Sequence, residues 1–347
     1  MSGMARKRIA ETVAGGCVLA LSVTLMPVAA AAQTPAQGKI YTMKITLPTM
    51  NDPSYFYTKA YAAALEKDSG GRIKPQIFPL SQLGSIPRQI EGTQFGSIQC
   101  AVIPPEFFVG VDDRFEVMSA PGLVDSMDNG QRVSADPAVR KLMLGLGSNK
   151  GLHGVAMFMN APSSVIAKVP IRHIADFKGK KIRVLASPFQ MAPISKLGAT
   201  PVAMTLADVV PALQQGAVDG AVGGIVVWTP MHFADAAKYV TQTGQPAVFV
   251  MVEVNKAWYE SLPADLQKIV DDDAAAEQKA IGPLASEIVA KAGQGWTATG
   301  GELIKLPPDE QTQLMKTFSS AVAEVAKSKP SLDAAYKLVS DAAKRTR

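Results

Sequence analysis

Apolar residues recur with two different periods along the first third of the chain. Every second residue is apolar over 41–47, which predicts a strand with one buried face. Residues 53–69 have a helical pattern that two glycines end, and 73–78 again favour a strand. A strand, a helix and a strand in this order predict a right-handed βαβ unit.

The same alternation of elements continues toward the middle of the chain. A helix around 88–95 is followed by an apolar strand over 98–103. Further on, the pattern predicts a helix over 205–215, shortened or kinked by Pro211, and strands over 181–186, 202–204 and 218–222. The chain is therefore expected to be an α/β protein.

The pattern changes after Pro263, where helical spacing dominates. Residues 264–294 are nearly free of helix breakers apart from Gly282-Pro283, which predicts one long helix or two joined at a kink. Two further helices are expected after Pro308 and from Ser331.

Composition bounds the classes of function. The chain has 347 residues, of which 47% are hydrophobic and 19% charged, so it suits a globular protein of two domains. A net charge of +5 does not indicate a nucleic-acid partner, which requires a basic stripe. With 3 His and 2 Cys, no metal site and no cofactor are expected.

The first residues have the pattern of an export signal. A basic cluster at 6–8 precedes the uncharged stretch 12–32, which ends in three alanines before Gln33. This order predicts a signal peptide over 1–32 and a periplasmic mature protein without stable membrane insertion. The alternative is an uncleaved anchor, because the uncharged stretch nearly spans a bilayer. In the mature chain, Cys100 has no cysteine partner and is expected in a buried strand.

Sequence signals of catalysis are missing. The chain has no Gly-x-Ser-x-Gly elbow and no phosphate-binding loop. Its three histidines lack metal-ligand spacing and a local acidic partner. An enzyme is therefore unsupported, although scattered residues could converge in space, and a binding protein is the remaining prediction.

The most informative local feature is a charge inside an apolar strand. Arg183 lies between Ile182 and Val184, so it points to the opposite face from both neighbours. Burying an arginine in a covered sheet is costly without an anion, and its guanidinium suits a carboxylate. The alternative is an arginine that pairs with a protein carboxylate or is simply exposed.

Several segments taken together resemble a known family. In this order and spacing, they are similar to the substrate-binding proteins of tripartite ATP-independent periplasmic (TRAP) transporters, often called C4-dicarboxylate-binding, over nearly the whole mature chain. The segments are Ser69-Gly70-Gly71-Arg72-Ile73, Asp176-Phe177-Lys178-Gly179-Lys180-Lys181-Ile182-Arg183-Val184, Leu197-Gly198-Ala199-Thr200-Pro201 and Ala212-Leu213-Gln214-Gln215-Gly216-Ala217-Val218-Asp219-Gly220.

The resemblance implies a two-lobed α/β fold, like that of periplasmic binding proteins, with a cleft between the lobes and a long helix spanning both. The implied lobes are residues 38–160 with 250–286, and residues 161–249 with 287–347. A ligand bound in the cleft would be delivered to a TRAP-type membrane permease without ATP. Arg183 aligns with the arginine that clamps the ligand carboxylate in this family.

The chain also departs from the family pattern. Many relatives have a second arginine where this chain reads 161–165, and polar residues where it has Gly223-Gly224. The glycines are expected to leave room for a bulky ligand. One arginine and an apolar surround predict a monocarboxylate, aromatic or branched, in preference to a small dicarboxylate.

The resemblance and the strand ends together give a set of candidate ligand-binding residues. For the apolar members the alternative is core packing, and for the acid an exposed loop. The set is Arg183, Gly223, Leu206, Phe189, Glu106, Trp228, Ser163 and Thr49. The expected function is an exported solute-binding protein for an organic acid, with a permease as partner. A receptor for a sensor kinase, or a periplasmic enzyme on the same fold such as a lyase, are the alternatives.

Overall fold

The computed structural model describes residues 39–347, so the predicted signal peptide over 1–32 lies outside the described residues. In the described part, ten strands form one sheet, whose main path is β2-β1-β3-β9-β4-β7-β5-β6. The strands are β1 (Tyr41–Thr46), β2 (Ile73–Phe78), β3 (Cys100–Ile103), β4 (Leu152–Ala167), β5 (Lys181–Val184), β6 (Thr200–Ala203), β7 (Gly220–Gly224), β8 (Tyr239–Thr241), β9 (Ala247–Asn255) and β10 (Glu302–Ile304).

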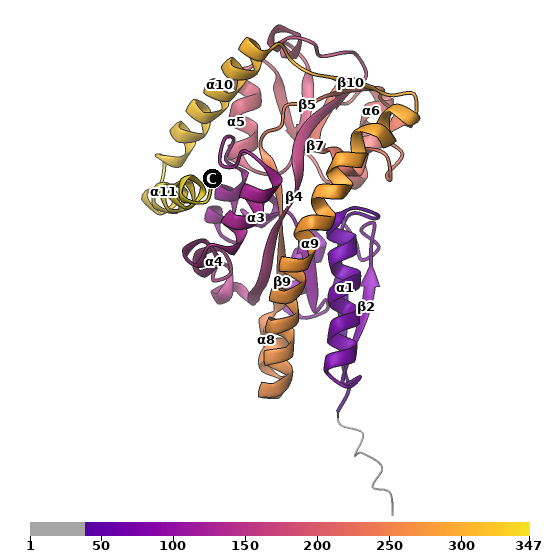
Figure 1. Cartoon of the computed structure of the whole chain (residues 1–347), viewed down its shortest axis with the longest axis vertical. Helices are drawn as coiled ribbons and strands as arrows, with labels where there is room; N and C mark the ends of the chain where they lie inside the picture. The colour runs from indigo at the N-terminus through magenta and orange to yellow at the C-terminus, as the bar shows by residue number, and fades with distance from the viewer. Residues whose placement is uncertain (1–38) are drawn as a thin grey trace, which may run out of the picture. The chain divides into compact units, whose positions relative to one another are not determined.

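Helices connect the strands and cover the sheet (Figure 1). The α-helices are α1 (Pro53–Asp68), α2 (Ile86–Phe95), α3 (Met127–Ala135), α4 (Pro137–Met143), α5 (Pro188–Lys196), α6 (Val209–Gln215), α7 (Ile225–Trp228), α8 (Lys256–Glu260), α9 (Ala264–Ala298), α10 (Pro308–Ala326) and α11 (Pro330–Arg345). Short 3₁₀ helices are η1 (Pro105–Phe108), η2 (Asp113–Ser119), η3 (Ser148–Lys150), η4 (Ile174–Phe177), η5 (Leu206–Asp208) and η6 (Phe233–Asp235). Of the helices in residues 39–347, none is both long and apolar enough to cross a membrane.

The predicted βαβ unit is present at the start of the described chain. β1 and β2 pair in parallel, with Tyr41 opposite Ile73, and α1 connects them. Asp52 caps the start of α1 by accepting a hydrogen bond from the Tyr55 backbone N–H, and Pro53 occupies the first turn. Local capping and strand alternation therefore suffice to define this unit.

Two long central strands join the two ends of the sheet. β9 pairs with β3 on one side and β4 pairs with β7 on the other, while β4 and β9 pair with each other in antiparallel orientation. We call β2, β1 and β3 the first sheet half, and β7, β5 and β6 the second sheet half. The two sheet halves are therefore separated by β9 and β4.

The long helix near the C-terminus is one continuous element. α9 has 35 residues and includes Pro283 without ending there. It contacts α1 in the region of the first sheet half, and α7 and β10 near the second (Figure 1). The predicted long helix spanning both parts of an α/β fold is therefore confirmed, and the alternative of two joined helices is wrong.

Pro211 shortens the helix that the sequence places over 205–215. The segment begins as η5, and α6 starts only at Val209. Pro211 then lies in the first turn, where a backbone N–H has no partner within the helix, so its missing donor has no cost.

The C-terminal helices bind to different parts of the molecule. α10 packs against α5, which follows β5, whereas α11 packs against η2, α3 and α4. Residues of α11 such as Val339 belong to the same hydrophobic cluster as Phe115 of η2. The last helix thus covers elements of the chain's first half, although the resemblance places it in the second lobe.

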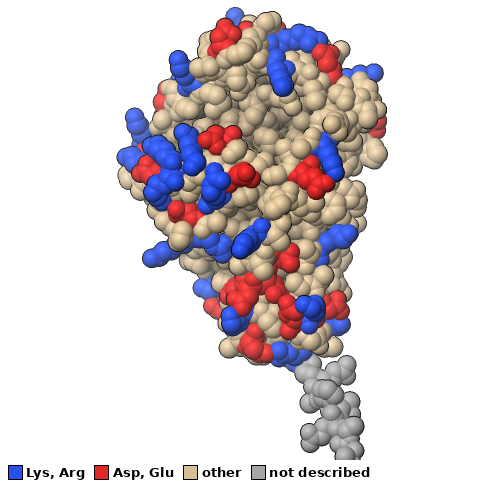
Figure 2. All heavy atoms as spheres, in the orientation of Figure 1, with Lys and Arg blue, Asp and Glu red and all other residues tan. Residues whose placement is uncertain are grey.

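Charged side chains are distributed over the surface. Figure 2 shows basic and acidic side chains intermixed on the face it presents. Many of them pair with each other, such as Lys268 with Asp272 and Lys196 with Glu324. Exposed pairs of this kind contribute little to stability but limit large fields of one sign.

Candidate functional site

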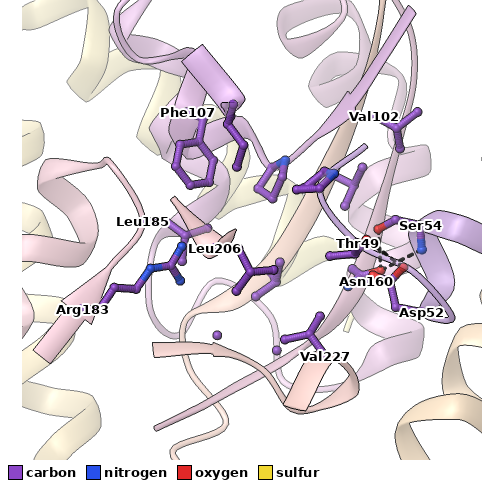
Figure 3. Close-up of a pocket in the computed structure, with 17 residues that line it drawn as sticks. Thr49, Asp52, Ser54, Val102, Phe107, Asn160, Arg183, Leu185, Leu206 and Val227 are labelled. Atoms are coloured by element: carbon purple, nitrogen blue, oxygen red, sulfur yellow. Dashed lines mark hydrogen bonds between the residues drawn. The ribbon is translucent and has the colours of Figure 1, made fainter. Parts of the chain in front are cut away.

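A cavity lies between the two sheet halves and is lined by residues of both and of the central strands β4 and β9 (Figure 3). It encloses about 510 Å³ free of protein atoms, a figure that includes open solvent at its mouth. Most of its wall is apolar. The apolar lining consists of Pro48, Ile86, Val102, Pro104, Phe107, Leu185, Leu206, Gly223, Gly224, Val227, Val248 and Val250.

Arg183 supplies the cation of this cavity. It is on β5 and only 2% exposed. Its Nε donates to the Met204 carbonyl at 2.9 Å and its Nη1 to the Val222 carbonyl at 2.8 Å, which fixes the guanidinium plane. Among residues 39–347, no carboxylate oxygen lies within salt-bridge distance of it. In the described chain, Arg183 is therefore buried without a protein counterion. It is neither paired with a protein carboxylate nor exposed, which were the two alternatives.

Burial lowers the pKa of Arg183 to about 10, while the charges of Glu106 and Asp208 act in the opposite direction. The side chain is still a cation at neutral pH. Two of its five N–H groups are used by backbone carbonyls, so the remaining donors are free for a ligand. A carboxylate takes two such donors in a planar, bidentate arrangement.

A polar cluster lies across the cavity from Arg183 (Figure 3). We call its four residues, Thr49, Asp52, Ser54 and Asn160, the polar tetrad; all four are at most 7% exposed. Asp52 accepts hydrogen bonds from the Thr49 hydroxyl at 2.9 Å and the Asn160 amide at 3.3 Å. Burial raises the pKa of Asp52, and these hydrogen bonds, together with that from Tyr55, oppose the rise.

The cavity therefore has a simple chemical layout. Among its lining residues, Arg183 is basic and Asp52 is acidic, and no other lining side chain is ionisable. The space between them is bounded by aliphatic side chains and Phe107. Such a cavity is complementary to a molecule with a carboxylate at one end and an apolar body.

The cavity brings together half of the residues that the sequence singled out. Arg183, Thr49, Leu206 and Gly223 line it, and the other four candidates do not. Phe189 is fully buried in the hydrophobic core, where its ring packs edge-on against Tyr336. Phe189 is therefore a core residue, which is the alternative to ligand binding.

Glu106 is fully buried and is not among the residues that line the cavity. Its Oε1 accepts a hydrogen bond from Gln190 at 3.0 Å, and Gln190 in turn accepts one from the backbone N–H of Leu185. Burial raises the pKa of Glu106 to about 7, with the charge of Arg183 among the opposing influences. Glu106 thus contacts the wall through Gln190 and is not an exposed loop acid.

Trp228 fills the space that the sequence assigned to the ligand beside Gly223. A Cβ on Gly223 would lie 2.6 Å from the indole ring, and the indole N–H donates to Ser164 at 2.7 Å. The prediction that this glycine leaves room for a bulky ligand is therefore wrong, because a buried indole occupies that room. Ser163 lies in a separate surface hollow with Gln242 and Thr243.

Sequence reasoning missed most of the polar tetrad. Asp52 and Ser54 flank the start of α1, and their only sequence signal is their position just after a strand end, where ligands of α/β proteins bind. Asn160 lies on β4, 108 residues from Asp52, and has no local signal. Phe107 follows the candidate Glu106 by one residue but is the one that reaches the cavity.

Comparison with known proteins agrees with this architecture. Residues 46–329 match the model of a family described as bacterial extracellular solute-binding protein, family 7 (DctP). The chain belongs to this family. The sequence-based prediction of the family is thus confirmed, and solute binding is the function of this class.

Individual relatives are more distant. The chain is 30% identical over 208 residues to the uncharacterized protein YiiZ of Salmonella typhimurium, and 29% over 204 residues to the C4-dicarboxylate-binding periplasmic protein DctP of Rhodobacter capsulatus. These alignments cover 60% and 58% of this chain, and 64% and 61% of the two relatives, so each spans slightly less than two thirds of the relative.

A solved structure shows the same fold. The TRAP periplasmic solute-binding protein of Desulfovibrio salexigens with bound orotic acid superposes with a TM-score of 0.83 at 23% identity, covering 88% of this chain and all of that one. The predicted two-lobed α/β fold is therefore confirmed.

Proposed function

We propose that this protein captures an organic monocarboxylate in the cavity and delivers it to a TRAP-type membrane permease. The observation that carries the proposal is Arg183, a buried cation with free donors and no carboxylate of residues 39–347 paired with it. A buried charge of this kind is costly in the empty cavity and gains a partner when an anion binds. Family membership supports the role in solute capture.

The preference for one carboxylate is supported by the lining of the cavity. Arg183 is the sole basic residue in the lining that residues 39–347 form, and the opposite end holds Asp52. The Rhodobacter capsulatus relative is named for C4-dicarboxylates, whereas the Desulfovibrio salexigens protein holds orotic acid, which has one carboxyl group. Other solved structures hold succinate and malate, so the preference for one carboxylate rests on the lining of this cavity.

Ligand capture would close two lobes over the cavity, with the boundaries given by the resemblance as a first approximation. Contacts between η2 and the start of α5 support such an interface. Glu116 accepts hydrogen bonds from the Ser187 hydroxyl at 2.9 Å and the Phe189 backbone N–H at 3.0 Å. A ligand that touches both sides favours the closed state because only that state offers all its contacts.

We propose further that the mature protein acts in the periplasm, without a cofactor or catalytic activity. The uncharged N-terminal stretch supports export. A receptor that presents the same ligand to a sensor kinase is the alternative. Uptake of the labelled ligand by cells that express the protein with its permease distinguishes the two roles.

The direct test is a thermal-shift screen of the mature protein, starting at Gln33, against a library of organic acids. A ligand at ~100 times its Kd adds about 2.7 kcal/mol to the unfolding free energy. Hits among monocarboxylates support the proposal. Stronger hits among dicarboxylates contradict the proposed ligand class, and a screen without acid hits contradicts acid binding itself.

A further inference from the structure

The polar tetrad has fixed hydrogen-bond directions. Asp52 Oδ1 accepts from the Thr49 hydroxyl and the Tyr55 backbone N–H, and Oδ2 accepts from the Asn160 amide. Three donors around one carboxyl group are the arrangement of an ionised carboxylate, which only accepts. The hydroxyl hydrogen of Thr49 therefore points at Asp52, and its lone pairs remain for another partner.

The direction of the Ser54 hydroxyl follows in the same way. Asn160 Oδ1 accepts from the Ser54 backbone N–H at 3.1 Å, so this atom is the carbonyl oxygen and not the amide nitrogen. The Ser54 hydroxyl lies 2.9 Å from the same oxygen and must donate to it. Both hydroxyl hydrogens of the tetrad are thus used internally, and its hydroxyl oxygens can only accept.

The charge at the tetrad end of the cavity is negative, as is the partial charge of the hydroxyl oxygens that can accept there. Asp52 is fully buried behind Thr49 and Asn160, and no basic residue of the described cavity lining lies with it. Figure 3 shows Arg183 on the opposite side. In a cavity with apolar walls, a negative charge acts over this distance with little screening by solvent. A group that binds the two hydroxyl oxygens must therefore bring a hydrogen-bond donor, while the second amide N–H of Asn160, which has no partner in the described chain, can donate to the same group.

We infer that the polar tetrad selects acids whose end distal to the carboxylate bears a hydrogen-bond donor, a hydroxyl or an amine, and rejects a second carboxylate. This inference rests on the proposed function, because Arg183 must hold the first carboxylate. A second carboxylate would place its oxygens against the acceptor oxygens of Thr49 and Ser54 and a negative charge beside Asp52, and one N–H of Asn160 compensates only part of this. An alkyl end would leave the hydroxyl lone pairs without a partner.

The test compares acids that differ only at the distal end. Three series are titrated by calorimetry. The first is butanoate, 4-hydroxybutanoate, 4-aminobutanoate and succinate, and the second consists of the matching six-carbon acids, with adipate as the dicarboxylate. The third is benzoate, 4-hydroxybenzoate, 4-aminobenzoate and terephthalate. In the series that fits the cavity best, the hydroxy or amino acid is expected to bind at least about tenfold more tightly than the dicarboxylate and the unsubstituted acid.

Asp52→Asn tests the source of this selectivity. Asparagine is an equally good N-cap, so α1 is expected to keep its start. The tenfold preference over the dicarboxylate should fall to about threefold or less. The matched control is Asp136→Asn, which changes the N-cap of α4 outside the cavity lining and should leave the ratio unchanged.

A second variant guards against a folding defect in the first. Thr49→Val keeps the shape of the side chain and removes the acceptor, so it should reduce the preference for the hydroxy or amino acid over the unsubstituted acid. A dicarboxylate or an unsubstituted acid that binds most tightly overturns the inference and leaves acid binding through Arg183 intact. Equal ratios in folded Asp52→Asn and wild type also overturn it. If no acid in any series binds, the proposed function fails as well.

Discussion

Replacing Arg183 by methionine tests whether this side chain holds the ligand. Methionine keeps an unbranched apolar stem of similar reach and removes the guanidinium. In the protein, Nε and one Nη1 hydrogen are bonded to Met204 and Val222, and the rest of the guanidinium is free. The substitution therefore deletes the two charged hydrogen bonds that a bound carboxylate would accept.

The expected loss follows from these two bonds. A hydrogen bond to a charged group contributes about 1.5–3 kcal/mol, so two contribute roughly 3–6 kcal/mol. At about 1.4 kcal/mol per tenfold, the Kd should rise by a factor of roughly 100 to 10,000. Arg183→Lys keeps the charge but not the planar fork, and should fall between the wild type and Arg183→Met.

Stability must be measured beside affinity. Arg183→Met leaves the buried Val222 carbonyl and the partly buried Met204 carbonyl without these donors, at about 1–3 kcal/mol for the buried one, and removes a buried cation that has no paired carboxylate among residues 39–347. The two effects oppose each other, so thermal melts of the empty variant should show a folded protein. Arg114→Met is the matched control, because Arg114 is paired with Asp112 outside the cavity lining.

Affinity is measured by calorimetry with the strongest acid from the screen. Arg114→Met should bind it like the wild type. A folded Arg183→Met protein whose Kd stays within about threefold of the wild type would refute the reasoning. The anion would then be held by other groups.

Three further predictions concern packing and burial. Gly223→Ala should destabilise the protein by about 1–3 kcal/mol, because the added Cβ would overlap the Trp228 indole. Gly224→Ala should cost less, since the nearest atom to its added Cβ lies at 3.2 Å, and equal melting temperatures of the two variants would contradict this. Burial raises the pKa of Glu116 to about 7, so folding favours its protonated form, and Glu116 alone should lower the unfolding free energy by up to about 3 kcal/mol from pH 4.5 to 7. Urea unfolding should show a smaller fall in Glu116→Gln than in the wild type over this range, and an equal fall would count against the prediction. Glu253→Met should raise the melting temperature at pH 7, because both carboxylate oxygens of Glu253 are buried without a partner in the described chain and burial raises its pKa well above the usual range; a lower melting temperature would contradict this.

Much of the fold could be predicted because its signals are local. The βαβ unit follows from alternation over 41–47 and 73–78 and from the helical pattern between them. The sequence does not decide the continuity of α9, because a proline inside a helix destabilises it unless tertiary contacts compensate. α9 packs against both α1 and β4, and such contacts cannot be deduced from periodicity.

The candidate site was predictable to the extent that each residue has a local signal. A charge between Ile182 and Val184 singled out Arg183, and a polar residue after a strand end singled out Thr49. Trp228 and Phe189 were expected near the ligand, and packing of the folded chain directs both away from the cavity. Which face of an apolar segment meets a cavity depends on contacts distant in sequence.

Glu106 shows how a residue near the site in sequence acts through another. Gln190 lies between Glu106 and Leu185, and Leu185 lines the cavity two residues after Arg183. The segment from Arg183 to Leu185 therefore carries both the proposed carboxylate contact and the connection to η1. Under the proposed closure, a ligand that fixes this segment also fixes the side chains that join the two sides of the cavity. Ligand affinity and closure should then respond together to changes at Gln190, although Gln190 is not part of the cavity lining.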